Sequence, residues 1–390
     1  MPILPLALGF FVSLLAALML VPVARRLALR AGWVDAPDGN RKAHQTAVPN
    51  SGGVAIVAAT CIAIAVMTVA RLHLPKSLSG ALTLPDPLVL LGALLIAAVG
   101  LWDDVKEISH RTKFVGQLVV TALAFWGGAR VQVFDADLGD GTLALVVSGV
   151  LTVVWMVGMM NAVNLIDGMD GLAGGVVAIA FAGLAAAHAI GGDLGALVLV
   201  AAVGGALIGF LRYNFAPASI FMGDSGSLFL GYALAAYALR GSAHSSPTLA
   251  LVIPTIIMGI PVLDTGVSIL RRKLTGKPLF YPDRDHIHHR LQSLMSTRRA
   301  ALTLYAFGLF LSLGALAMAM MPSALAFLTF LLGSVVVYGF LSYVRYLPTP
   351  SGVVRFVDRR RRLRRLIGDR EPRAGRVSRE RFQPTASPER

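Results

Sequence analysis

Apolar residues gather along this chain into long blocks that are separated by shorter polar stretches. Each block holds about 16 to 24 residues, so that as a helix it would cross the roughly 30 Å hydrocarbon core of a bilayer. About eleven blocks are present, and they start near Ile3, Gly52, Pro87, Phe114, Thr142, Leu172, Gly195, Ser227, Leu249, Ala300 and Ser323. The pattern predicts an all-α fold, a polytopic integral membrane helix bundle with about eleven transmembrane helices.

The composition agrees with this pattern, because 56% of the 390 residues are hydrophobic and only 14% are charged. The single cysteine, Cys61, lies inside the second block. No internal disulfide is possible, and we expect the thiol to behave as a small buried apolar group.

Lysine and arginine concentrate in alternate loops. One set of loops contains Arg25, Arg26, Arg30, Arg41, Lys42, Lys106, Arg111, Lys113, Arg212, Arg271, Arg272, Lys273, Lys277, Arg284, Arg290, Arg298 and Arg299. The other set holds little beyond Arg71, Lys76, Arg130 and Arg240. Because short loops that stay in the cytoplasm keep their basic residues, an odd number of crossings places the N-terminus outside and the C-terminus in the cytoplasm.

The net charge of +14 would suit a nucleic-acid partner, but its distribution argues against one. Residues 355–390 hold thirteen arginines and five acidic residues, a net charge of +8. Each basic residue near an anionic leaflet contributes about 1 kcal/mol of attraction. We expect residues 1–346 to form the transmembrane domain and residues 347–390 to form a basic cytoplasmic tail, which either contacts anionic lipids or is simply solvated.

Polar residues collect in the loops of the basic side. These loops contain DAPDGNRKAHQTAVPNSGG, LWDDVKEISHRTKFVGQ, NAVNLIDGMDGLAGG, RYNFAPASIFMGDSGS and YPDRDHIHHRL. Loops that only connected helices would hold scattered and interchangeable polar residues. The sequence therefore predicts that five polar loops converge on one membrane face.

Asp103 and Asp104 end the third block, directly after Leu101 and Trp102. Neighbouring side chains on a helix point about 100° apart, so the two carboxylates should face different partners. The helix dipole disfavours carboxylates at a C-terminus, so this placement is costly unless cations lie near. A solvated acidic helix end is the alternative to a functional pair.

Asn161, Asn164, Asp167 and Asp170 recur at every third residue, with Gly168 among them and Gly171, Gly174 and Gly175 shortly after them. Glycine lets a ligand approach the backbone, and oxygen-bearing side chains without a neighbouring lysine suit a hard divalent cation or the edge of a base. An Asx-rich turn between two helices would account for one such residue but hardly for four.

Asp224, in FMGDSGS, comes just before the block that begins near Ser227. The backbone N–H groups of that helix start are placed to face an anion; the alternative is that Asp224 only caps the helix. Asn214 adds a polar group at the end of the preceding block.

The run YPDRDHIHHRL holds His286, His288 and His289 beside Arg284 and Arg290. No cysteine lies close by, so a closed structural zinc site is disfavoured. Histidine and arginine together suit phosphate oxygens, which they bind through charge-assisted hydrogen bonds. A solvated basic loop is the alternative.

Carboxylates and cations together at a membrane surface indicate Mg²⁺-dependent chemistry on a diphosphate. Magnesium binds through one or two carboxylates and keeps water and substrate oxygens as its other ligands. Phosphoryl transfer mainly needs positioning and charge neutralisation, which a metal and basic side chains supply. A site at headgroup depth can take one soluble substrate and one lipid substrate.

The five loops, in order from about Asp35 to Leu291, resemble those of the polyprenyl-phosphate N-acetylhexosamine-1-phosphate transferase family, whose relatives include the phospho-MurNAc-pentapeptide transferase. PDRDHIHHRL is similar to the branch that uses UDP-N-acetylglucosamine. The resemblance implies transfer of N-acetylglucosamine 1-phosphate from a UDP-sugar donor to the acceptor undecaprenyl phosphate, which releases UMP and initiates cell-envelope glycan synthesis. It also implies a multi-pass protein of the bacterial inner membrane whose active site faces the cytoplasm.

The resemblance implies a role for each polar position. Asp103 would assist attack by the lipid phosphate and Asp104 would support the metal site, with Asp167 as a third catalytic carboxylate. Asn164 and Asp224 would bind Mg²⁺, for which Mn²⁺ is a substitute. Asp170 would recognise the uracil edge, and the rest of the donor would be held by Lys113, Asn214, His286, His288, His289 and Arg290. The early-loop residues that match the family without a defined role are Arg41, Lys42 and His44.

Several alternatives stay open at this stage. Another UDP-N-acetylhexosamine is an alternative donor, and the lipid phosphate attacks either directly, which we favour, or through an aspartyl-linked intermediate. A secondary transporter would also be all-helical, but it would place its carboxylates near the bilayer midplane; Asp264 is the deepest acidic residue here. A lipid-binding scaffold would leave the aspartates unexplained. A homodimer is compatible with the sequence.

Overall fold

The structure is a computed structural model that describes residues 3–35, 47–73, 85–132, 141–192, 197–240, 247–275 and 286–347. The early-loop residues Arg41, Lys42 and His44 lie outside the described residues, as do Arg284 and residues 348–390 of the basic tail. The division at residue 346 therefore stays a prediction.

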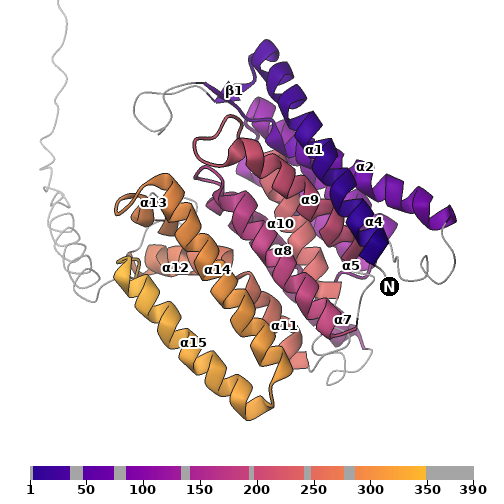
Figure 1. Cartoon of the computed structure of the whole chain (residues 1–390). Helices are drawn as coiled ribbons and strands as arrows, with labels where there is room; N and C mark the ends of the chain where they lie inside the picture. Colours follow the sequence, from indigo (N-terminus) through magenta and orange to yellow (C-terminus); the bar gives the residue numbers. More distant parts are fainter. Residues whose placement is uncertain are drawn as a thin grey trace, which may run out of the picture.

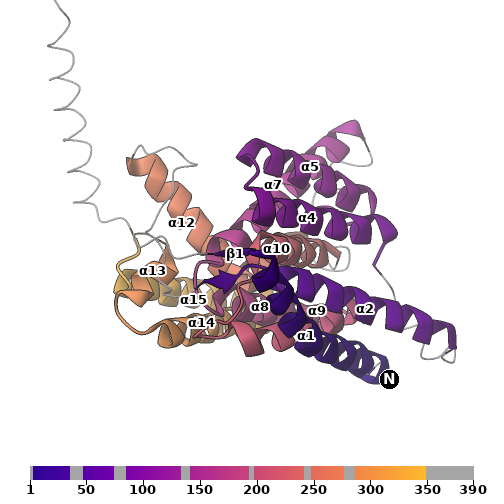
Figure 2. The ribbon, with the colours of Figure 1, turned by 90° about the horizontal axis from the view of Figure 1, so that it is seen from above.

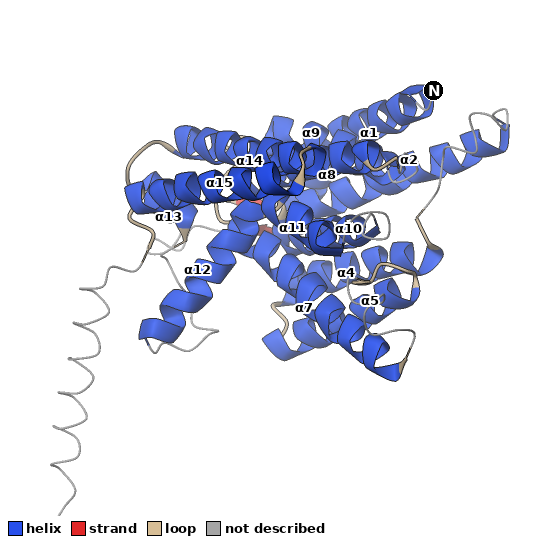
Figure 3. Cartoon of the chain, turned by 90° about the horizontal axis from the view of Figure 1, so that it is seen from below, coloured by secondary structure: helices blue, strands red, loops and turns tan. Residues whose placement is uncertain are grey.

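Almost all of the described chain is helical (Figure 3). The helices are α1 (Ile3–Ala31), α2 (Gly52–His73), α4 (Pro87–Lys106), α5 (His110–Trp126), α7 (Thr142–Ile166), α8 (Leu172–Ile190), α9 (Leu197–Asn214), α10 (Gly223–Arg240), α11 (Pro247–Ile257), α12 (Gly259–Thr275), α13 (Ile287–Gln292), α14 (Thr297–Met320) and α15 (Ser323–Tyr343). Two short strands, β1 (Val34–Asp35) and β2 (Val48–Pro49), pair antiparallel.

Eight of the described helices are long and apolar enough to cross a bilayer: α1, α2, α4, α7, α8, α9, α14 and α15. Residues Leu251–Ile257 and Gly259–Leu274 would make a ninth span if the two count as one, although they meet at a bend of 88°. Figures 2 and 3 show α12 projecting away from the other helices after this bend. The prediction of a polytopic helical membrane protein is confirmed, with eight or nine candidate spans in the part of the chain that the structure describes.

Helix α10 forms the centre of the bundle. Every residue from Ser225 to Leu239 is buried, and the helix packs on α2, α4, α7 and α8. A helix that is apolar on all sides is expected to be enclosed by others. The outer helices instead expose apolar side chains such as Phe11 (57%) and Val335 (68%), which suits contact with lipid. Figure 1 shows β1, α13 and the C-terminal end of α1 at the same end of the bundle.

Glycines allow three helices to meet closely where the polar loops begin. A Cβ on Gly53 of α2 would lie 2.1 Å from the backbone nitrogen of Gly226 in α10, and a Cβ on Gly100 of α4 would lie 2.4 Å from the backbone oxygen of Asp224. Small residues at such crossings let helix backbones pack directly on each other in a membrane. Close packing of α2, α4 and α10 therefore positions the start of α10.

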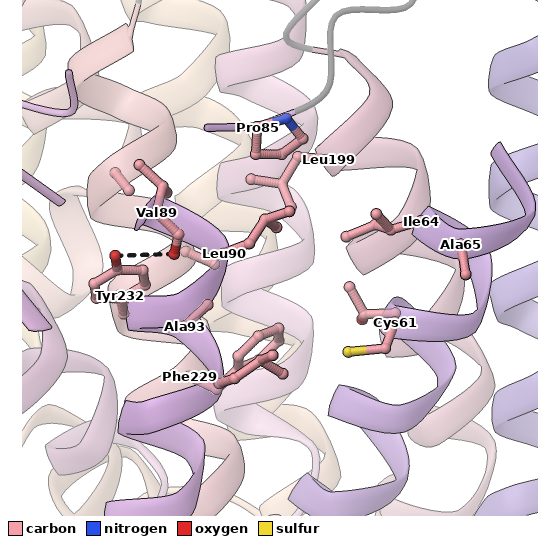
Figure 4. A pocket seen from close by; sticks show the side chains of 14 residues that line it. Cys61, Ile64, Ala65, Pro85, Val89, Leu90, Ala93, Leu199, Phe229 and Tyr232 are labelled. Atoms are coloured by element: carbon pink, nitrogen blue, oxygen red, sulfur yellow. Dashed lines mark hydrogen bonds between the residues drawn. The ribbon is translucent and has the colours of Figure 1, made fainter. Parts of the chain in front are cut away.

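Farther from the polar loops, α2, α4, α9 and α10 line an apolar cavity of about 200 Å³ that is partly open to the bundle surface (Figure 4). The Tyr232 hydroxyl donates to the backbone oxygen of Val89 at 3.0 Å, so this polar group is satisfied inside an apolar lining. Cys61 lines the cavity from α2. The expectation of a buried thiol was wrong, because Cys61 is exposed on the bundle surface, where the surrounding solvent in a bilayer is hydrocarbon.

We expect the substitution Gly53→Ala to destabilise the bundle by about 1–3 kcal/mol, since the added methyl group overlaps the backbone of α10 and neither backbone can move independently. Gly158→Ala in α7 is the matched control, because nothing lies within 4 Å of a Cβ at that position. Thermal unfolding of the two purified variants in detergent measures the difference. An unchanged Tm for Gly53→Ala would contradict the close approach.

Candidate active site

Asp103 is held in place by the way α4 ends. Glu107 adopts a left-handed conformation (φ +47°), and its N–H donates to the backbone oxygen of Asp103 at 2.8 Å. The chain then turns so that the N–H of Ile108 donates to Asp103 Oδ1 at 2.8 Å. Asp103 Oδ2 pairs with Lys113 Nζ at 2.9 Å. Lys113 is therefore the cation that a carboxylate at this helix terminus requires.

Asp104 faces the opposite set of partners, as the angle between neighbouring side chains predicts. Its Oδ1 accepts hydrogen bonds from the N–H of Asp224 at 2.7 Å and from Asn50 Nδ2 at 3.2 Å. Its Oδ2 accepts from the N–H of Ser225 at 2.9 Å. The anion that faces the start of α10 is therefore Asp104, which satisfies donors that a helix start leaves unpaired. Gly223, at φ +75°, leaves room for this carboxylate.

Asp224 completes a charged cluster with α4, α5 and α7. Its carboxylate forms an ion pair with Lys113 and accepts from Asn164 Nδ2 at 2.6 Å; Asn164 also donates to Ser227 Oγ at 2.9 Å. The side chains of Lys113, Asp103 and Asp224 are 14%, 16% and 27% exposed. This partial exposure lets a soluble molecule reach the cluster, although most of each side chain is enclosed.

The loop after α7 brings two more carboxylates to the cluster. Burial, followed by the nearby negative charges of Asp224, Asp104 and Asp170, raises the pKa of Asp167 to about 8. Asp170 Oδ2 accepts from the N–H of Ala218 at 2.9 Å. The hydrogen bond between Asp170 and Ala218 places the loop between α7 and α8 beside the loop that precedes α10.

Asn214 holds the same two loops together. It is 3% exposed, its Oδ1 accepts from the N–H of Gly171 at 3.0 Å, and its Nδ2 donates to the backbone oxygen of Ile220 at 2.9 Å. Both polar atoms of its amide are therefore engaged within the protein. Asn161, the first of the four regularly spaced residues, exchanges two hydrogen bonds with Gln117 of α5 and so binds helices together beside the site.

The histidines approach this loop from α13. His288 is 1% exposed, and within the part of the chain that the structure describes neither of its ring nitrogens has a hydrogen-bond partner. A Cβ on Gly168 would lie 2.6 Å from His288 Nε2, so the ring rests against the loop that carries Asp167. Burial, followed by the neighbouring His289, lowers the pKa of His288 to about 3. His288 is thus a neutral buried ring with hydrogen-bonding capacity to spare, a rare and costly state that a ligand would relieve.

The remaining members of the histidine run lie around His288. The ring of His286 stacks on it at 5.8 Å between centroids, and the ring of His289 lies 4.2 Å away on another side. His289 and Arg290 are partly exposed, whereas His286 is buried. The structure thus brings all the predicted site residues to one end of the bundle.

The donor set fits a magnesium ion better than zinc. Among the described residues, no three histidine, cysteine, aspartate or glutamate side chains converge closely enough to hold a metal by themselves. Magnesium needs only one or two carboxylates besides water and substrate oxygens, and Asp103 and Asp224 supply such oxygens on either side of Lys113. Asn164 presents its amide nitrogen to Asp224, so it serves as a metal ligand only with the amide turned over.

Sequence reasoning missed two contributors to this site. Asn50 supports Asp104 from the residue pair before α2, and Ser227 receives a hydrogen bond from Asn164. Both lie inside polar motifs that were recognised, NSGG and GDSGS. Their partners lie 54 and 63 residues away in the chain, which no local pattern reveals.

The fold and the site define an integral membrane protein that carries a charged cluster of polar side chains at one end of its bundle. The profile of glycosyl transferase family 4 matches residues 87–242. Three relatives extend the comparison. A Bacillus subtilis protein named probable undecaprenyl-phosphate N-acetylglucosaminyl 1-phosphate transferase is 37% identical over 80% of this chain and 84% of its own length. Mycolicibacterium smegmatis decaprenyl-phosphate N-acetylglucosaminephosphotransferase is 33% identical over 72% of this chain and 74% of its own length.

The third relative is the phospho-N-acetylmuramoyl-pentapeptide-transferase of Levilactobacillus brevis, which is 32% identical over 79% of this chain and 95% of its own length. These similarities extend well beyond the region matched by the family profile. The chain belongs to the polyprenyl-phosphate N-acetylhexosamine-1-phosphate transferase family, within glycosyl transferase family 4. The resemblance noted in the sequence is confirmed.

We expect Asp104→Asn to destabilise the fold by about 1–3 kcal/mol, because an amide offers one acceptor atom where the carboxylate satisfies backbone donors with both oxygens. Glu107→Gln is the control, since it makes the same chemical change three residues later at an exposed position. Thermal unfolding of both variants in detergent measures the effect. If the two variants melt at the same temperature, Asp104 does not anchor the start of α10.

Proposed function

We propose that this protein transfers N-acetylglucosamine 1-phosphate from UDP-N-acetylglucosamine to undecaprenyl phosphate. An oxygen of the lipid phosphate forms a bond to the β-phosphorus of the donor, the bond from that phosphorus to the bridging oxygen breaks, and UMP leaves. The product is a lipid-linked diphosphosugar, the starting unit for cell-envelope glycan synthesis. Carboxylates, a lysine and histidines that meet at one end of an apolar bundle support this reaction, because one substrate is water-soluble and the other is a lipid.

The relatives support the choice of substrates. The Bacillus protein is named for an undecaprenyl acceptor, the mycobacterial protein for a decaprenyl acceptor, and both for N-acetylglucosamine. The Levilactobacillus protein is named for a different donor sugar. The donor in this proposal is therefore UDP-N-acetylglucosamine. Competition among UDP-N-acetylhexosamines would reveal a preference for a different donor.

Asp224 and Asp103 would hold Mg²⁺ or, in its place, Mn²⁺, together with Asn164 in the turned-over conformation. When bound there, a divalent cation would supply positive charge that offsets the charge of the donor diphosphate. Asp104 has a positioning role, because both of its oxygens accept hydrogen bonds within the protein, from the start of α10 and from Asn50. It therefore fixes Asp224 and does not touch the substrate.

The acceptor needs little activation. A phosphate monoester dianion is already a nucleophile, so we propose direct displacement without an aspartyl-linked intermediate. Asp103 borders the path of the acceptor and Lys113, held by Asp103 and Asp224, neutralises charge on the phosphates. Asp167, the third carboxylate, lies in the loop after α7, near the charges of Asp224 and Asp104. Ping-pong kinetics would contradict direct displacement.

The donor is held on the other side of the cluster. His288, whose ring nitrogens have no partner among the described residues, donates to the diphosphate, with His286, His289 and Arg290 around it. Asp170, in the loop held by Asn214, faces the uracil. Asn214 contributes by positioning this loop, since its own amide is engaged by Gly171 and Ile220.

The membrane arrangement in this proposal has eleven crossings, with α5, α10 and the bent pair α11 and α12 added to the eight long apolar helices. The N-terminus lies outside, and the C-terminus and the site lie on the cytoplasmic side of the bacterial inner membrane, as the positions of lysine and arginine favour. The arginines of the tail bind anionic lipids. Labelling of single cysteines from either side of sealed vesicles, in a Cys61→Ser background, tests this orientation.

The rival functions have less support. A secondary transporter would require carboxylates that face a pathway at the midplane, whereas the cluster described here lies at helix ends. A lipid-binding scaffold gives no reason for a buried histidine beside several aspartates.

Incubation of the purified protein with UDP-N-acetylglucosamine, Mg²⁺ and undecaprenyl phosphate should release UMP only when all three are present. Chromatography of the nucleotides measures the release, and omission of the lipid is the control. No UMP with any UDP-N-acetylhexosamine would refute the proposed function.

Asp224→Asn should abolish turnover or raise the Mg²⁺ concentration needed for half-maximal rate by about tenfold or more, because a neutral amide is a poorer ligand for a hard cation. Asp86→Asn is the matched control, since Asp86 caps the opposite end of α4 and asparagine caps equally well. A magnesium titration of the initial rate separates the two variants. Normal activity of Asp224→Asn at low Mg²⁺ would remove Asp224 from the metal site.

A further inference from the structure

A second buried polar network lies behind the histidines. Asp264 of α12 is fully buried and accepts hydrogen bonds from two distant segments. Its Oδ2 pairs with His286 Nδ1 at 2.9 Å, and its Oδ1 accepts from the N–H of Ile287 at 2.9 Å. The hydroxyl of Tyr346, 82 residues away, donates to the same carboxylate and lies 3.1 Å from Ser268 Oγ. A carboxylate enclosed in apolar surroundings requires such donors.

Tyr346 reaches Asp264 through a strained helix end. After α15, the N–H of Arg345 donates to Ser342 O at 3.0 Å and the N–H of Tyr346 donates to Leu341 O at 2.8 Å, which is the Schellman pattern. Arg345 occupies the left-handed position of this pattern with φ +53°, where glycine is the usual residue. Such a conformation costs about 1 kcal/mol or more.

The strain at Arg345 is offset by the contacts that the turn allows Tyr346 to make. The Tyr346 side chain is 1% exposed, and the guanidinium of Arg271 lies 5.3 Å from the centre of its ring. Backbone strain that the surroundings maintain tends to mark functional positions. Here the strained cap points a hydroxyl at Asp264, the carboxylate that bonds His286 and Ile287.

Asp264 in turn fixes the start of α13. The first N–H groups of a helix lack partners within the helix, and Asp264 accepts one of them, from Ile287, while it also holds the side chain of His286. Helix α13 has only six residues, too few to be stable without anchors. His288 follows Ile287 directly and rests against Gly168, so the network sets where His288 lies relative to the loop of Asp167.

We propose that Asp264 and Tyr346 are positioning residues that hold His288 in the donor site. The C-terminal end of α15, which places Tyr346, therefore contributes to donor binding. This inference rests on the proposed function, because it assigns donor binding to His288. It predicts that loss of the Tyr346 hydroxyl weakens binding of the UDP-sugar. Binding of the lipid acceptor is unaffected, because its phosphate lies beside Lys113, which Asp103 and Asp224 hold.

Tyr346→Phe in the full chain tests the proposal, since it removes one hydroxyl and keeps the ring. We expect KM for UDP-N-acetylglucosamine to rise about tenfold, the effect of one lost hydrogen bond to a charged group, while KM for undecaprenyl phosphate stays unchanged. Tyr343→Phe is the matched control, because Tyr343 ends the same helix with its side chain 73% exposed. Equal donor KM values in the two variants would overturn the proposal.

A double-mutant cycle with His288→Ala separates positioning from a general structural role. If Tyr346 acts through His288, adding Tyr346→Phe to His288→Ala should change donor KM by less than about twofold, because interacting residues give non-additive effects. Fully additive effects, or a lower Tm with unchanged donor KM, would contradict the proposal. Inactivity of the wild-type protein with every UDP-N-acetylhexosamine would instead refute the proposed function, so the two failures are distinguishable.

Discussion

The site depends on how the bundle stabilises carboxylates at the ends of apolar helices. Asp103 and Asp104 end α4, where the helix dipole is unfavourable to negative charge. Lys113 pairs with Asp103, and the N–H groups at the start of α10 bind Asp104. The hydrogen bond from its own N–H to Asp104 places Asp224, and Lys113 forms a second ion pair with the carboxylate of Asp224. Any change in the packing of α4 on α10 would therefore alter the charge balance of the whole cluster.

The site has two halves that meet at the loop between α7 and α8. The carboxylate half is built on α4, α5 and α10 and reaches the loop through Asn164, which donates to Asp224. The histidine half is built on α12, α13 and the end of α15 and reaches it where His288 rests against Gly168. A donor diphosphate bound between the halves would contact metal ligands on one side and the buried imidazole on the other.

Much of this arrangement could be predicted from local sequence. Block length predicted the membrane helices, and the 100° angle between neighbouring side chains predicted that Asp103 and Asp104 would have different partners. The roles of Asn161 and Asn214 could not be read from their spacing, because each is defined by a partner on another helix or loop, Gln117 for Asn161 and Gly171 for Asn214. Asp264 looked like an isolated deep acid, since its partner Tyr346 lies 82 residues farther along the chain.

The sequence by itself determined that the chain is a membrane-embedded helix bundle and that its chemically capable residues lie in alternate loops, because hydrophobic length and charge are properties of each segment alone. Only the tertiary structure decided which residue neutralises which. Each carboxylate here is stabilised by donors from helices that meet through glycine contacts, and such contacts depend on distances across the bundle. The strained turn at Arg345 has the same origin, because its conformation is maintained by the burial of Tyr346 against Asp264.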